Sequence, residues 1–271
     1  MKKILNLMLI LCFAICFFSC PNCKTKSMAN TIKTTSSKPK MAIVIDDFGS
    51  FDQSGVETLS KCPEKLTCAV LPNVDNTVAN AKQFEALGHE IILHMPMQSH
   101  VNLPEDWYGP VYIKNHDTPE TACNKLDECL KAFPNVKGFN IHIGSGVSRN
   151  KELMTAIYNH AKSLGLYFLD SRTIETHATE DACKETDSVY LGRDVFLEAD
   201  KNRSYSGVCH RLLEAAEIAK QKGTAIAIGH VGAEGGENTA KAILDTLPKI
   251  KEMGVEIVPL SEIYEDLKIK K

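Results

Sequence analysis

Met41-Ala-Ile-Val-Ile-Asp-Asp-Phe-Gly49 joins an apolar run to a pair of carboxylates. Residues 41–45 are rich in β-branched side chains, which predicts a short strand buried on both faces. Asp46 and Asp47 follow at once, and ligands of parallel α/β sheets bind where the strands end. One carboxylate there can hold a metal while the other handles a proton. A single Asp in this position is more often the cap of the next helix, but a pair after a buried strand favours function.

The alternation of buried strand and helix continues along the chain, with short connections and no change in amino-acid composition that would indicate a second domain. We expect one α/β domain over residues 41–271, built from repeated β-α units around a parallel sheet. A closed or nearly closed (β/α)-barrel explains why polar residues follow so many strands, and a flat doubly wound sheet is the alternative. The expected strands are 41–45, 66–71, 90–93, 138–143, 166–169, 188–191 or 194–197, 224–228 and 255–259. The expected helices are 54–61, 75–87, 118–133, 151–164, a Thr- and Glu-rich one after 173, 207–222, 238–253 and 261–267.

The first 40 residues are predicted to direct export. Residues 1–19 resemble a signal peptide, with Lys2 and Lys3 before an apolar segment that is short for a membrane span. Ser19-Cys20 is similar to a bacterial lipoprotein cleavage site, and an ordinary secretory signal is the alternative. Residues 20–40 predict a flexible tether. We therefore expect the protein in the cell envelope or periplasm, attached to a membrane only through a lipid at Cys20.

Composition excludes several classes of function. The net charge of −3 gives no case for nucleic acid binding, which a basic surface would favour. The chain lacks a glycine-rich dinucleotide fingerprint and a phosphate loop. The six cysteines of residues 41–271 include no close pair of the structural zinc type. Export permits disulfides, but the sequence does not decide their pairing or the oligomeric state.

Five expected strand exits carry side chains suited to a hydrolytic metal site. A lone His after a strand is more often a satisfied structural residue, but several His and Asp at successive exits favour a shared site. Zinc prefers imidazole and carboxylate ligands, and a catalytic zinc keeps one position for water. The residues are Asp46, Asp47, His94, His142, Asp170 with Arg172, and His230.

Five motifs resemble the divergent polysaccharide deacetylases, a branch of the NodB-like carbohydrate deacetylase superfamily. They occur in the family's order and span most of residues 41–265. The resemblance implies a deformed (β/α)-barrel of about seven strands and one divalent metal, usually Zn²⁺. The motifs are Ile45-Asp-Asp-Phe-Gly49, Gly88-His-Glu-Ile-Ile-Leu-His-Met-Pro-Met97, Asn140-Ile-His-Ile-Gly-Ser145, Phe168-Leu-Asp-Ser-Arg-Thr173 and Ile228-Gly-His230.

The resemblance also implies roles for the site residues. Asp47 and His94 match metal ligands, Asp46 the catalytic base, and His230 the acid that protonates the leaving amine. The superfamily has a second His at the position of Gln98, and we expect His142 to supply that ligand instead. Arg172 is expected to hold Asp46 or Asp170 ionised. Ile141 and Val231 replace the Asn and Pro that are usual in the branch.

The function expected from the resemblance is hydrolysis of an N-acetyl or O-acetyl group on an acetylated polysaccharide or peptidoglycan-type glycan. An envelope module that binds a glycan or protein without catalysis is the first alternative, motivated by Gln98. A metal-dependent esterase or phosphoesterase is the second. Trp107, Tyr108 and Tyr112 lie in the expected insert after His94, where they either stack on sugar rings or pack the loop.

Overall fold

The structure is a computed structural model that describes residues 38–133, 135–199 and 203–271. The predicted signal peptide, the lipidation site at Cys20 and nearly all of the predicted tether lie outside the described residues. Within the described part, no helix combines the length and apolar character that a membrane crossing requires.

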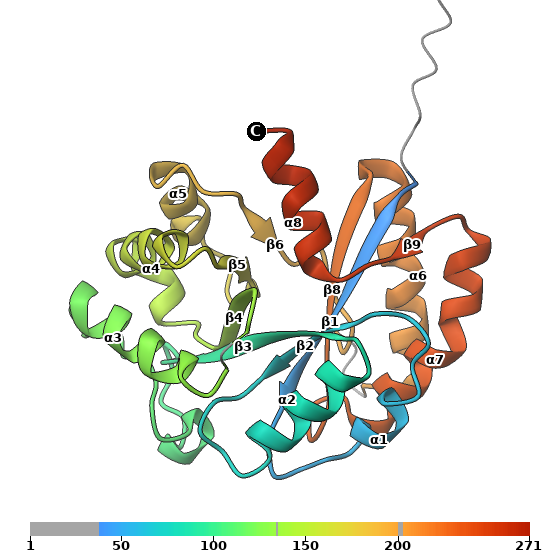
Figure 1. Cartoon of the computed structure of the whole chain (residues 1–271), viewed down its shortest axis with the longest axis horizontal. Coiled ribbons are helices and arrows are strands. Elements are labelled where there is room, and N and C mark those ends of the chain that lie inside the picture. Colours follow the sequence, from blue (N-terminus) through green and yellow to red (C-terminus); the bar gives the residue numbers. More distant parts are fainter. Residues whose placement is uncertain (1–37, 134, 200–202) are drawn as a thin grey trace, which may run out of the picture. The chain divides into compact units, whose positions relative to one another are not determined.

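The described domain is a curled parallel sheet with helices around it (Figure 1). The strand order is β6-β5-β4-β3-β2-β1-β8-β7, with β9 paired to the start of β1. All strand pairs are parallel. The strands are β1 (Lys40–Phe48), β2 (Thr67–Val70), β3 (Glu90–Met97), β4 (Gly138–Ile143), β5 (Tyr167–Asp170), β6 (Leu191–Gly192), β7 (Val195–Phe196), β8 (Thr224–His230) and β9 (Glu256–Ile257).

The sheet curls into a half-barrel rather than a closed one. β6 and β7 stand at the two ends of the strand order, and the chain passes between them through Arg193 and Asp194. Both short segments that the sequence left as alternatives, 188–191 and 194–197, therefore contribute a strand. The predicted α/β class and deformed parallel barrel are confirmed, and the flat doubly wound alternative is wrong.

The helices begin and end close to the sequence signals. Thr118, Asn150 and Ser204 cap three of them by accepting a backbone N–H of the first turn, which satisfies a donor that the helix leaves free. The predicted helix over 54–61 shortens to a single turn. The helices are α1 (Val56–Leu59), α2 (Thr77–Ala86), α3 (Pro119–Leu130), α4 (Lys151–Ser163), α5 (Ala178–Glu185), α6 (Tyr205–Lys222), α7 (Gly236–Glu252) and α8 (Leu260–Ile269), with 3₁₀ turns at Glu105–Tyr108 and Val147–Arg149.

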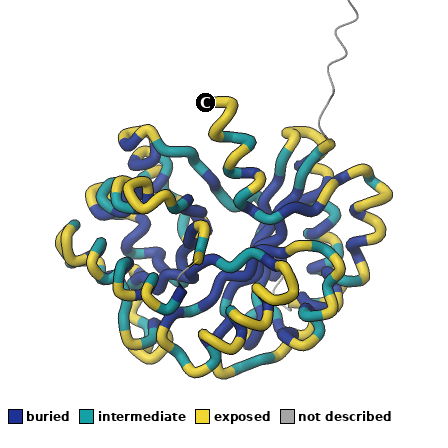
Figure 2. Tube along the Cα trace, viewed as in Figure 1, coloured by how far each residue is buried: buried dark blue, intermediate teal, exposed yellow. Residues whose placement is uncertain are grey.

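The core has two layers, one on each face of the sheet. Met41, Ile43 and Ile45 of β1 pack toward the surrounding helices, whereas Ala42 and Val44 point into the barrel interior. Leu260 and Ile263 of α8 join the interior cluster. Because the Leu260 N–H donates to Thr67 Oγ1 at the start of β2, α8 closes the end of the barrel where the strands begin. The buried strands form the centre of Figure 2, with exposed helix faces outside.

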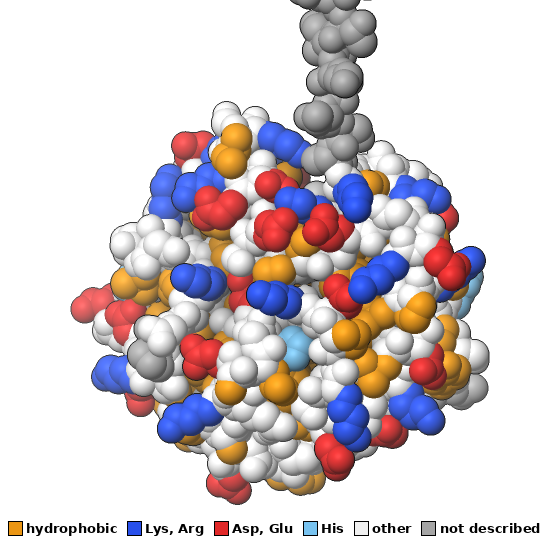
Figure 3. All heavy atoms as spheres, turned by 45° about the vertical axis from the view of Figure 1, so that its right-hand side comes forward, with side chains coloured by type: hydrophobic (Ala, Val, Ile, Leu, Met, Phe, Trp, Pro, Cys, Tyr) orange, Lys and Arg blue, Asp and Glu red, His pale blue; other side chains and the backbone are white. Residues whose placement is uncertain are grey.

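The surface carries charges of both signs. Lys and Arg side chains are interspersed with Asp and Glu over the face shown in Figure 3. The six cysteines of the described residues are all free, including Cys123 and Cys129 on α3. The sequence left disulfide pairing open, and the described part of the structure contains none.

The two-sided burial of β1 gives a stability prediction. Ile43→Ala removes buried atoms from the outer layer and is expected to lower the free energy of unfolding by about 2–5 kcal/mol. Urea denaturation followed by circular dichroism measures the change. Val78→Ala, at a side chain that is 52% exposed, is the control and should change it by less than about 0.5 kcal/mol. Equal effects of the two substitutions would contradict the assigned core.

Candidate metal centre and catalytic residues

A β-bulge in β1 brings both carboxylates to one cavity. The register pairs Ile45 with Cys68 and Phe48 with Val70, so β1 has one more residue than β2 over this interval. Asp47 takes up the extra residue with φ 67°, a left-handed conformation that is rare for residues other than glycine. Bulges re-aim side chains in this way. The predicted strand ended before Asp46; it continues to Phe48, and the bulge replaces the expected turn.

Asp47, His94 and His142 converge at the carboxyl ends of β1, β3 and β4. Asp47 Oδ1 lies 3.3 Å from His94 Nε2 and 3.1 Å from His142 Nδ1. The two imidazole nitrogens are 3.1 Å apart. The three ligand atoms lie within 4.8 Å of one another, as a shared metal ion requires.

The hydrogen bonds of the two histidines suit a cation. Asn140 Oδ1 lies 2.7 Å from His94 Nδ1, and the carbonyl oxygen of Trp107 lies 3.1 Å from His142 Nε2. Each oxygen accepts a ring N–H, so the lone pairs of His94 Nε2 and His142 Nδ1 face each other. Asp47 Oδ1 is buried and receives no hydrogen bond. Three acceptors around one point are the arrangement that a divalent metal such as zinc would satisfy.

The carboxylate of Asp47 is held ionised. Burial is the largest influence and would raise its pKa, but the hydrogen bonds that His142 and His94 donate when they are protonated outweigh it, so the pKa of Asp47 lies well below its usual range. An ionised carboxylate is the form that binds metal.

Asp46 is buried beside the three ligands. Its Oδ1 accepts a hydrogen bond from Asn140 Nδ2 at 2.7 Å. Its Oδ2 lies 3.8 Å from His94 Nε2 and 3.9 Å from His230 Nε2. Burial raises the pKa of Asp46, and the nearby histidines and Asn140 only partly offset it. A raised carboxyl pKa suits a group that takes up a proton.

His230, at the end of β8, is held in its charged form by a buried carboxylate. His230 Nδ1 lies 3.1 Å from Glu198 Oε2, and the His230 backbone N–H donates to Glu198 Oε1 at 3.0 Å. Thr239 Oγ1 also donates to Oε1 at 2.6 Å. Burial alone would lower the pKa of His230, but Glu198 outweighs it and raises that pKa to about 10.

Sequence reasoning missed Glu198 and Asn140. Glu198 directly follows the segment 194–197 that was expected to be extended, so it is an acidic residue at a strand exit, the signal used for Asp46 and Asp170. Asn140 stood inside a quoted motif without a role. Its amide joins Asp46 to His94.

Asp170 and Arg172 lie at the end of β5 but do not pair through the guanidinium. Asp170 is buried and accepts hydrogen bonds from the Arg172 backbone N–H at 2.8 Å and the Tyr190 hydroxyl at 2.9 Å. Burial raises the pKa of Asp170. Among the described residues the Arg172 guanidinium forms no ion pair with Asp46 or Asp170; it donates to the carbonyl of Arg193 instead.

The insert between β3 and β4 supports the site. Gln98 accepts a hydrogen bond from the Asn115 backbone N–H through Oε1, so its side chain is turned toward the insert. Tyr108 is buried and stacks on Tyr112 with 4.5 Å between ring centroids. These two tyrosines pack the loop. Trp107 remains 58% exposed and reaches His142 only through its carbonyl.

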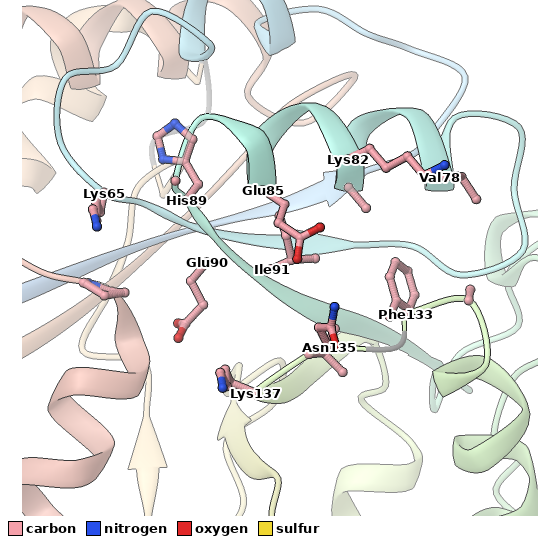
Figure 4. Close-up of a pocket in the computed structure, with 15 residues that line it drawn as sticks. Lys65, Val78, Lys82, Glu85, His89, Glu90, Ile91, Phe133, Asn135 and Lys137 are labelled. Atoms are coloured by element: carbon pink, nitrogen blue, oxygen red, sulfur yellow. The ribbon is translucent and has the colours of Figure 1, made fainter.

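The site residues line a cavity of about 300 Å³ at the carboxyl ends of the strands. Asp46, Asp47, His94, His142 and His230 all contribute to it, and so does Arg172; Asp170 is not in its lining. A second cavity, of about 340 Å³, lies where β3 begins. Figure 4 shows its lining, with Lys82 and Glu85 on α2 and Ile91 on β3. None of the predicted site residues line this second cavity.

The parallel half-barrel places two histidines and an aspartate around a candidate metal position, next to a second carboxylate and a charged imidazole. These are the groups that a metal-dependent hydrolase uses. The model of the divergent polysaccharide deacetylase family matches residues 43–264. The chain belongs to that family, as its motifs predicted, and membership supports a hydrolytic activity.

Known relatives agree with this assignment. The uncharacterised protein YibQ of Escherichia coli K12 is 30% identical over 195 residues, which are 70% of this chain and 58% of YibQ. An uncharacterised crystal structure from Agrobacterium tumefaciens C58 superposes with a TM-score of 0.75 at 20% identity, covering 83% of this chain and 89% of that one. The catalytic domain of a peptidoglycan N-acetylglucosamine deacetylase from Eubacterium rectale ATCC 33656 gives 0.52 at 14% identity, covering 82% and 89%. These two structures share the fold.

The three converging ligands predict a Zn²⁺ site that single substitutions destroy. Asp47→Ala, His94→Ala and His142→Ala should each weaken Zn²⁺ binding by more than about 100-fold. Loss of a residue that only hydrogen-bonds to a metal ligand already lowers metal affinity by about 10–100-fold. Competition with a chromophoric chelator measures the affinity. His160→Ala is the control, since His160 pairs with Asp127 on the helical surface. Unchanged affinity in any of the three variants would contradict that ligand's assignment.

The Glu198 contact predicts how His230 titrates. Since the folded pKa is about 10 against an ordinary 6.5, His230 stabilises the fold fully below about pH 6.5. That contribution is lost as the pH rises toward about 10. Glu198→Gln should move the pKa of His230 down, as measured by NMR titration of its ring protons. Glu214→Gln, which alters a surface pair with Arg211, should leave it unchanged. A His230 pKa near 6.5 in the unaltered protein would refute the assignment.

Proposed function

We propose that this protein removes N-acetyl groups from an acetylated envelope glycan, using a divalent metal, preferably Zn²⁺, held by Asp47, His94 and His142. The observation that carries the proposal is the position of Asp46 and His230 beside the three ligand atoms. Asp46 Oδ2 lies within 4 Å of both His94 Nε2 and His230 Nε2. The deacetylase family gives this arrangement its chemical context.

A divalent metal held by Asp47, His94 and His142 would supply Lewis acidity, which would polarise an acetyl carbonyl and make water easier to deprotonate. Asp46 takes the proton from the attacking water through Oδ2, since Oδ1 is engaged by Asn140. Its raised pKa lets it hold that proton while the C–N bond breaks. His230, charged because of Glu198, donates a proton to the departing amine, which leaves with the sugar as acetate forms.

The same proposal covers where the protein acts. We propose export through residues 1–19 and attachment at Cys20, so that an acetylated polysaccharide or peptidoglycan-type glycan is within reach. The binding-module alternative rested on Gln98. His142 lies close enough to Asp47 and His94 to share a metal ion with them, which supports hydrolysis over binding alone.

Asp46→Asn tests the proposed base. It should lower acetate release from acetylated chito-oligosaccharides or peptidoglycan fragments by about 100- to 10,000-fold, with Zn²⁺ content unchanged because Asp46 is not a proposed ligand. Acetate is measured by a coupled enzymatic assay. Asp127→Asn is the matched control, because Asp127 pairs with His160 away from the cavity.

Full activity in the Asp46→Asn variant would remove Asp46 from the mechanism. A zinc-loaded, folded wild-type protein that releases no acetate from any of these substrates would overturn the proposed function itself.

A further inference from the structure

Two arginines line the cavity beside the proposed metal ligands, beyond β4 in the strand order. Arg172 follows β5, and Arg193 lies in the link between β6 and β7, where the sheet is open. The metal ligands come from β1, β3 and β4. The cavity thus has a carboxylate-imidazole part and a guanidinium part.

Backbone carbonyls hold the two guanidiniums in place. Arg172 Nη1 donates to the carbonyl of Arg193 at 2.9 Å. Arg193 returns two hydrogen bonds, from Nη2 to the Arg172 carbonyl at 2.8 Å and from Nε to the Ser171 carbonyl at 2.7 Å. The Arg172 backbone has φ 48°, which a non-glycine residue adopts only where the surroundings impose it. The pair is therefore fixed in position before any ligand arrives.

No carboxylate neutralises these guanidiniums directly. Among the described residues neither Arg172 nor Arg193 forms an ion pair within 4.0 Å, although both are near acidic groups. Glu234, which lines the same cavity, pairs with Arg203 at 2.9 Å. Asp170 is engaged by the Tyr190 hydroxyl and a backbone N–H. Arg172 is exposed and Arg193 is half-buried, and no carboxylate contacts either guanidinium, so both cations are accessible to an anionic ligand in the cavity.

Each guanidinium also keeps a donor group for such a ligand. Within the described part of the chain, Arg172 Nη2 and Arg193 Nη1 have no hydrogen-bond acceptor. Neither is among the buried atoms that lack a partner, so both remain accessible to a ligand. Guanidinium groups recognise carboxylates through paired N–H donors. A singly charged carboxylate suits the cavity better than a doubly charged phosphate, because Asp46 and Asp47 lie in the same lining.

We propose that Arg172 and Arg193 form a subsite for a carboxylate on the glycan, so that the preferred substrate is an acidic acetylated sugar. This inference rests on the proposed function for the acetyl group, while the recognition of the carboxylate is a binding property of its own. The carboxylate would occupy the β5–β7 side of the cavity and direct the acetyl group toward Asp46.

Equilibrium binding tests the subsite without requiring turnover. Trp107 is the single tryptophan of the chain, and its carbonyl contacts His142, so its fluorescence reports ligands at this site; calorimetry provides an independent reading. The probes are N-acetylmuramic acid, its methyl ester and N-acetylglucosamine, measured at one ionic strength. The ester lacks the negative charge of the acid and is larger by one methyl group. A hyaluronan tetrasaccharide, whose carboxylate is on the neighbouring sugar, distinguishes a lactyl carboxylate from a uronate.

Wild-type protein should bind the acid at least tenfold more tightly than the ester or N-acetylglucosamine. Arg172→Met and Arg193→Met should each reduce that ratio to near one. Arg172→Lys should give an intermediate ratio, because lysine keeps the charge but loses the paired N–H donors of the guanidinium. Arg149→Met is the control for charge, since Arg149 is exposed and outside the cavity lining. Circular dichroism checks that the variants are folded.

Equal affinity for acid and ester, no saturable binding of the acid, or a preference that survives Arg172→Met would overturn the proposal. Tighter binding of N-acetylglucosamine 6-phosphate than of N-acetylmuramic acid would overturn the choice of carboxylate over phosphate. These results are separable from the proposed function, because a protein that prefers the acid but releases no acetate would retain the subsite and lose the deacetylase.

Discussion

The extra residue in β1 is the constraint on which the rest of the site depends. Successive side chains of a regular strand point to opposite faces, so Asp46 and Asp47 could not both reach the cavity from an unbroken β1. The bulge opposite Cys68 and Val70 turns Asp47 into a left-handed conformation and places the two carboxylates side by side. The strained conformation persists because β2 and β8 hold β1 on both sides and its apolar residues are fully buried.

Hydrogen bonds from other elements then orient the side chains around the cavity. The amide of Asn140 fixes both the carboxyl group of Asp46 and the ring of His94, so the proposed base and a proposed metal ligand are oriented by one side chain. The carbonyl of Trp107 orients His142 in the same manner. On the other side, Glu198 couples His230 to Thr239 of α7. Each reactive group is thus aimed by a partner from a different element, which is how a rigid fold reduces the reorganisation that chemistry would otherwise require.

Much of the fold followed from the sequence because its signals are local. Buried apolar runs, caps such as Thr118 and Asn150, and the alternation of strand and helix depend on neighbours along the chain, and they gave the parallel α/β class. Polar residues at strand exits also identified the side chains that the structure gathers, including His94, His142 and His230. The features that sequence reasoning missed depend on contacts between residues that are far apart along the chain. The bulge is defined only against β2, Glu198 gains its role from His230 through a contact across 32 residues, and Tyr108 is distinguished from Trp107 only by what covers it.

The way α8 closes the barrel has a practical consequence. Lys40, where β1 begins, forms ion pairs with Glu262 and Asp266 of α8, and the C-terminus lies on the same side of the domain as Lys40 (Figure 1). Both ends of the described domain are therefore remote from the carboxyl ends of the strands, where the cavity opens. A purification tag, a fluorescent partner or a solid support joined at either end would leave that opening accessible to a polymer. Shortening α8, by contrast, would uncover the apolar interior at the end where the strands begin, so the C-terminal helix is a poor place to trim the protein.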